Sequence, residues 1–69
     1  MKSVFVVENG ERHEGGEIVS IHRTYKAAKA AALAVKPHFE GGWIQDKEVK
    51  DYYTNGCDFV MITKHEVEE

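Results

Sequence analysis

Apolar residues in the first third of the chain gather in two short runs separated by a polar stretch. The first run, SVFVVE at 3–8, holds four consecutive apolar residues, which is typical of a central strand covered on at least one face. The second run, EIVSIH at 17–22, places apolar side chains on both sides of an extended chain. Between them, NGERHEGG at 9–16 is glycine-rich and polar, as turns and loops are. The pattern predicts an antiparallel pair of strands.

The only long helical pattern lies at 24–36, TYKAAKAAALAVK. Alanine, leucine and lysine are strong helix formers, and Thr24 can act as N-cap by accepting a hydrogen bond from a first-turn N–H. Pro37 follows and cannot continue the helix. The rest of the chain has to be arranged around this element.

The predicted helix has an alanine face and a lysine face. One broad face carries Ala27, Ala28, Ala31, Ala32, Ala34 and Val35. The opposite stripe carries Lys26, Lys29 and Lys36, with Leu33 among them. Because an alanine face approaches a sheet closely but buries little area, larger core side chains must come from the strands. The candidates are Phe5, Val7, Ile18 and Ile21.

The C-terminal half contains one ambiguous segment, at 46–54. After the loop at 38–42, Trp43-Ile44 begins a third strand. As a helix, the segment would be capped by Asp46 and stopped by Asn55-Gly56. As a strand, it would form a hairpin through a two-residue Asn55-Gly56 turn. Both remain open, and the hairpin is favoured.

A final strand at 57–64, CDFVMITK, is expected in either case. In the hairpin, Tyr52 would lie opposite Phe59, and Val49 opposite Ile62. The acidic tail at 65–69 is expected to fray.

These elements predict one α+β domain spanning residues 1–69, an antiparallel sheet of about four strands with one main helix packed on one face. A chain of 69 residues with 42% hydrophobic content has a thin core. It has no evident metal site, and its single cysteine, Cys57, cannot form an internal disulfide. Self-association into a homodimer is therefore one expected source of stability.

The net charge and the hydropathy of the chain limit where we expect the protein to be found and which kinds of partner we expect it to bind. The formal net charge is −3, too acidic for general nucleic-acid binding and too mild for a DNA mimic. No apolar run approaches the length that spans a bilayer, and VFVV is too short for a signal-peptide core. We expect a cytoplasmic protein that does not bind membranes.

No catalytic, cofactor or metal motif stands out. The four histidines are scattered without helical spacing, and no second cysteine accompanies Cys57. The segment 9–16 lacks the phosphate-binding glycine patterns and carries glutamates instead. We therefore expect a protein that is not an enzyme and that needs no cofactor or metal.

Surface aromatic residues suggest protein binding. Tryptophan and tyrosine often anchor interfaces, and three such residues lie in the C-terminal half. The predicted contact residues are Trp43, Tyr52, Tyr53, Glu11, Glu14 and Leu33, with Tyr52 or Tyr53 as the exposed aromatic. An alternative is a small nucleic-acid-associated regulator that uses the lysine stripe, Lys26, Lys29 and Lys36. A solvated helix face accounts for these lysines more simply.

The order of these segments resembles small uncharacterised proteins of bacteriophages and prophages. The resemblance rests on VFVV, the acidic loop, EIVSIHRT, YKAAKAAA and the closing WIQ and YYTNGCDFVMITKHEVE. It implies a ββαββ fold, a phage source and a location in the host cytoplasm. It carries over no catalytic residues. The class of function that it implies is a non-enzymatic accessory protein that binds and inhibits a host protein or defence complex by steric occlusion.

Overall fold

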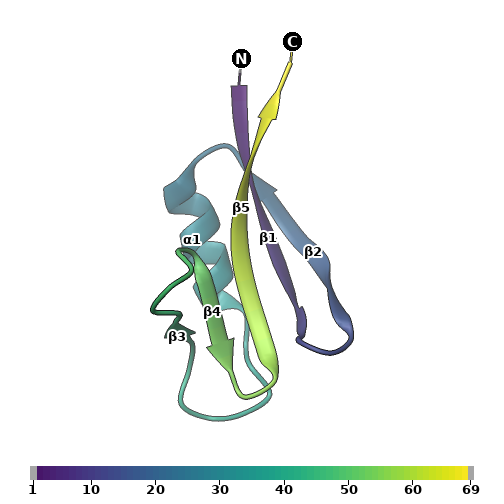
Figure 1. Cartoon of the computed structure of the whole chain (residues 1–69). Coiled ribbons are helices and arrows are strands. Elements are labelled where there is room, and N and C mark those ends of the chain that lie inside the picture. The colour runs from purple at the N-terminus through teal and green to yellow at the C-terminus, as the bar shows by residue number, and fades with distance from the viewer. Residues whose placement is uncertain (1, 69) are drawn as a thin grey trace.

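Five strands and one helix make up the computed structural model, which describes residues 2–68 (Figure 1). The elements are β1 (Lys2–Glu11), β2 (Gly15–His22), α1 (Tyr25–Ala34), β3 (Ile44–Gln45), β4 (Tyr52–Asn55) and β5 (Asp58–Val67). This confirms an α+β fold with an antiparallel sheet and one helix. It adds a two-residue strand, β3, to the predicted ββαββ order.

The sheet is organised around the two longest strands, which come from opposite ends of the chain. The strand order is β2-β1-β5-β4-β3, and every neighbouring pair is antiparallel. β1 pairs with β5 from Lys2↔Val67 to Glu11↔Asp58. The described ends of the chain therefore lie side by side (Figure 1). β1 is central, as its apolar run predicts.

Helix α1 begins and ends through local interactions. Thr24 is the N-cap, and its Oγ1 accepts a hydrogen bond from the backbone N–H of Ala27 at 3.2 Å. The helix ends at Ala34, and extended backbone at Val35 leads to Pro37. Both boundaries agree with the prediction from the sequence to within two residues.

The core lies between α1 and one face of the sheet. Ala28 and Ala32 are fully buried there with Val7 and Val60. The remaining buried members of this cluster are Tyr53 and Ile62, and Phe5 packs at its edge. Small helix residues let the helix axis approach the strands, so the strands supply most of the buried volume. Ala27 and Ala34, predicted to face the core, are exposed.

Two of the predicted core residues are placed elsewhere. Ile18 and Ile21 lie on the opposite face of the sheet and are 61% and 59% exposed. The prediction for them was wrong because β2 is an edge strand and the short helix lies across only one face. A bulge in the β1–β2 register between Val7 and Glu8 also shifts the alternation along β2.

The ambiguous segment divides into a turn and a short strand. At residues 46–51, Asp46 Oδ2 accepts hydrogen bonds from the N–H groups of Glu48 and Val49, and Asp51 has a positive φ of 59°. The β4–β5 turn consists of Gly56 and Cys57, with Gly56 at φ 61°. The turn therefore lies one residue later than predicted, and the β5 partner of each β4 residue is shifted by two positions. Tyr52 pairs with Met61, and Thr54 pairs with Phe59.

The acidic tail is largely part of the sheet. β5 continues to Val67, since pairing with β1 satisfies its backbone groups, so fraying of 65–67 was a wrong prediction. Residue 69 lies outside the described residues. Within residues 2–68, no helix has the length and apolar character needed to cross a bilayer.

Candidate interaction surface

The face of the sheet that points away from α1 is apolar, and we call it the open face. Its members follow from the strand register, because residues paired across neighbouring strands share a face. The apolar members are Val4, Val6, Ile18, Ile21, Ile44, Tyr52, Phe59 and Met61, and the polar side chains of Glu8, Thr54, Thr63 and His65 lie among them. Within residues 2–68, α1 is the only helix, and it packs against the other face (Figure 1).

The rim of the open face is more exposed than its centre. Ile44 on β3 is 66% exposed, and Ile18 and Ile21 on β2 are almost equally exposed. In the centre, Val6 and Phe59 are only 6% and 8% exposed, and the Tyr52 ring stacks on that of Phe59. Val4, Tyr52 and Met61 are half-buried. Isoleucines at the two outer strands thus frame a tightly packed centre.

Two aromatic rings pack together on the open face near the β4–β5 turn. The rings of Tyr52 and Phe59 are stacked, with centroids 5.8 Å apart and an interplanar angle of 11°. Gly10 pairs with Phe59 on one side and with Gly16 on the other. A Cβ added at Gly16 would lie 2.8 Å from the Phe59 ring, which therefore reaches across Gly10 to β2. Glycine at these positions makes room for the ring.

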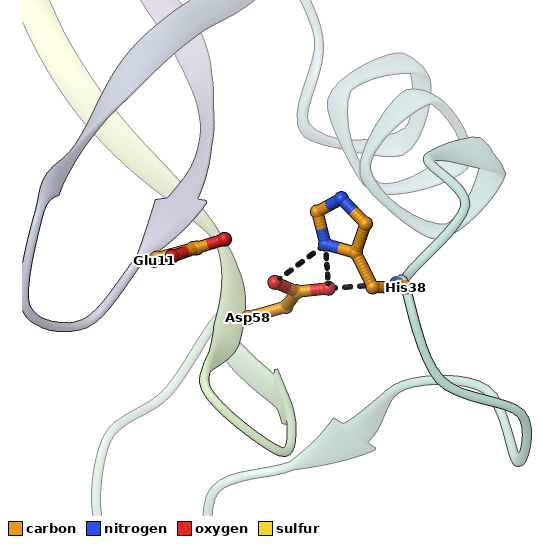
Figure 2. A group of neighbouring side chains, drawn as sticks. All are labelled: Glu11, His38 and Asp58. Carbon is orange, nitrogen blue, oxygen red and sulfur yellow. Dashed lines mark hydrogen bonds and ion pairs between the residues drawn. The ribbon is translucent and has the colours of Figure 1, made fainter.

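A charged cluster ties the loop after α1 to the start of β5. The backbone N–H of His38 donates to Asp58 Oδ2 at 2.7 Å, and the imidazole Nδ1 lies 2.8 Å from the same oxygen. Glu11 pairs with Asp58 across β1 and β5, and its carboxylate points toward the cluster (Figure 2). Asp58 is 4% exposed. The hydrogen bonds from His38 account for the burial of this carboxylate.

The same contacts shift the pKa values of His38 and Asp58. The hydrogen bond to Asp58, and then the charge of Asp58, raise the pKa of His38 above its ordinary value of 6.5. The backbone N–H of His38, followed by its side chain, lowers the pKa of Asp58 below 3.8. Carboxylates and imidazole can also bind divalent cations, but both Asp58 oxygens already accept from His38. We interpret the cluster as a structural ion pair.

Stability should therefore fall as the pH rises through the raised pKa of His38. A raised folded-state pKa contributes stability that is complete below the unfolded value and lost above the folded one. We expect the free energy of unfolding to decrease modestly between about pH 6 and pH 8, since the His38 side chain is 75% exposed. Urea unfolding at a series of pH values measures this.

His38→Gln should remove this decrease, whereas His13→Gln, at an exposed position in the β1–β2 turn, should keep it. An unchanged pH profile in His38→Gln would contradict the assignment.

Two tyrosines on the helix side are held in their protonated form. Tyr25 donates a hydrogen bond to Asp51, and this bond, with burial, raises the pKa of Tyr25 to about 12. Burial, and then the charge of Asp51, also raise the pKa of Tyr53. Neither phenol is tuned toward acid–base chemistry at neutral pH.

The predicted contact residues are scattered over the molecule. Tyr53 is 5% exposed in the core, so it is not the exposed aromatic. Trp43 is half-buried at the core edge, and its Nε1 donates to the Val35 carbonyl at 2.7 Å. Only Tyr52 belongs to the open face.

The other predicted contact residues lie away from that face. Leu33 is 47% exposed on α1. Glu11 and Glu14 line a shallow hollow in the β1–β2 hairpin. The lysine stripe, Lys26, Lys29 and Lys36, is exposed. These residues form no common surface with Tyr52.

Sequence reasoning missed the most exposed part of the open face. Ile18 and Ile21 were assigned to the core, and Ile44 was identified only as a strand residue. The pairing of β3 with β4, which places Ile44 beside Thr54, is not encoded locally. The available signal was the presence of apolar residues on both sides of β2, which one short helix cannot cover.

The open face is therefore the candidate contact surface. Comparisons of the chain with protein-family models, with curated proteins and with solved structures found no match.

Proposed function

We propose that this protein is a non-enzymatic protein-binding module and that the open face is its contact surface. The observation that carries the proposal is a largely apolar sheet face on which three isoleucines, Ile18, Ile21 and Ile44, are 61%, 59% and 66% exposed. Apolar patches of this kind mark interaction sites. Covering one such isoleucine contributes about 1 to 2 kcal/mol, so a few of them support specific binding.

The shape of the face suits binding by occlusion. Its centre is packed and its backbone is held in the sheet, so little ordering cost accompanies association. The resemblance to phage and prophage proteins makes a host protein the expected target. On this proposal the module inhibits its target by covering a functional surface.

Affinity capture from bacterial lysate tests the proposal with two matched variants. Ile21→Lys places a charge in the open face, and Leu33→Lys makes a comparable change at an exposed apolar position on α1. We expect Ile21→Lys to reduce recovery of a stoichiometric protein at least tenfold, and Leu33→Lys to leave it unchanged.

Loss of capture with Leu33→Lys alone would assign binding to the helix and reject the open face. Recovery of nucleic acid that disappears when Lys26 and Lys29 are changed to Glu would favour the alternative function.

A further inference from the structure

The molecule exposes more surface than a globular monomer of its mass. Its accessible surface is 5172 Å², whereas a folded monomer of 7.8 kDa is expected to expose about 4400 Å². The excess is about 800 Å², which is what one partner contributes to a standard interface. The elongated shape, 41 × 23 × 22 Å, is consistent with a subunit that is completed by association.

We propose that, when no other protein is bound, the open face packs against the open face of a second copy to form a symmetric homodimer. This inference rests on the proposed function, since it names the first occupant of the same contact surface. The target of the module then competes with the second copy. Two sheets packed face to face bury the rim isoleucines of both subunits.

The charges on the open face favour one orientation of the two copies. Along β1 and β5, the open-face pairs are Val4↔His65, Val6↔Thr63 and Glu8↔Met61. Consider first a two-fold axis that lies between the two sheets, perpendicular to the strands, at the position of the pair Val6↔Thr63. This axis reverses the strand direction, so Glu8 of one copy comes to the same height along the strands as His65 of the other. An axis along the strands would bring two Glu8 carboxylates to the same level. The first arrangement brings a carboxylate and an imidazole to one level on neighbouring strands, and the second brings two carboxylates to one level.

His65 is available for such a contact. It is exposed, and its Nε2 lies 3.1 Å from Thr63 Oγ1, on the same face of β5. Glu8 is half-buried, and the residues paired with it on the two neighbouring strands are Ile18 and Met61. A partner for this carboxylate from the second copy would offset the cost of covering it.

Sedimentation equilibrium over protein concentrations from low micromolar to submillimolar tests the dimer. We expect the wild type to change from monomer to dimer within this range. Ile21→Lys should raise the dimer dissociation constant by about two orders of magnitude. Leu33→Lys, on the other side of the molecule, should leave it unchanged. Circular dichroism and thermal unfolding check that each variant is folded.

A charge exchange tests the orientation. Glu8→Lys should weaken the dimer at least tenfold, and the double variant Glu8→Lys/His65→Glu should restore most of the lost affinity. A wild type that remains monomeric at every concentration would overturn the proposal. So would a dimer that Ile21→Lys leaves intact, or a double variant no tighter than Glu8→Lys.

The experiments can reject the proposed dimer and the proposed binding function independently of each other. A monomeric protein whose capture of a target depends on Ile21 would reject the dimer and keep the proposed function. A dimer sensitive to Ile21→Lys, combined with capture that ignores this change, would keep the dimer and reject the open face as the target-binding surface.

Discussion

We expect Tyr53→Ala to lower the free energy of unfolding by about 3 to 5 kcal/mol, as other aromatic-to-alanine changes in cores do. Tyr53 is 5% exposed and packs in the cluster formed with Val60 and Ala32. A domain of this size has a total stability of about 3 to 10 kcal/mol, so the variant should lose between about a third and all of its stability. The reason is a large cavity in a core that contains few large side chains.

Urea unfolding followed by the fluorescence of Trp43, the single tryptophan, measures the effect. Tyr53→Phe keeps the ring and should change stability by less than about 1 kcal/mol. Tyr52→Ala, on the open face and half-buried, should cost less than Tyr53→Ala. If Tyr52→Ala proved the more damaging change, the assignment of the two faces would be wrong.

Gly10→Ala should also be strongly destabilising, by about 2 to 4 kcal/mol. A Cβ at this position would lie 2.1 Å from the Gly15 carbonyl oxygen and 2.4 Å from Gly16 Cα. Both atoms belong to the backbone of β2, so β1 and β2 would have to separate. Because the hairpin carries Ile18 and Ile21, the change should also weaken binding at the open face.

Gly42→Ala provides the matched control, measured by the same urea unfolding. Gly42 has a φ of 70°, and a Cβ there would meet nothing within 4 Å. Its cost is therefore conformational only, about 1 to 2 kcal/mol. Equal losses in the two variants would show that crowding between β1 and β2 is absent.

The thin core and the open face have one common cause. A ten-residue helix with an alanine face covers only one side of a five-stranded sheet. The apolar residues of the strands exceed what this helix can bury, and the remainder appears on the second face. An exposed apolar sheet face therefore accompanies this architecture.

Local interactions made several elements predictable. The capping of α1 by Thr24 and its end before Pro37 involve residues within a few positions of one another. The β1–β2 hairpin depends on the glycines and polar residues near its turn. Both kinds of signal act over short stretches of sequence, and both predictions were confirmed.

The pattern of apolar and polar residues did not predict contacts between residues that are far apart in the sequence. His38 meets Asp58 across 20 positions, and Asn9 donates through its side chain to the Phe59 carbonyl across 50. The shift of the β4–β5 turn to Gly56-Cys57 moved the β5 partner of Tyr52 from Phe59 to Met61, and both partners lie on the same face because side chains alternate along a strand. Tyr52 and Tyr53 lie on opposite faces of β4, and only the choice of the face that α1 covers decides which tyrosine is buried.

The sequence by itself determined the helix, the first hairpin, the final strand and the α+β class, since propensity, capping and turn chemistry operate between near neighbours. Tertiary structure alone decided the pairing of β1 with β5, the side of the sheet that α1 covers, and hence the exposure of Ile18, Ile21 and Ile44. These features depend on which strand edges and faces meet, and that choice is made by the burial of the whole chain.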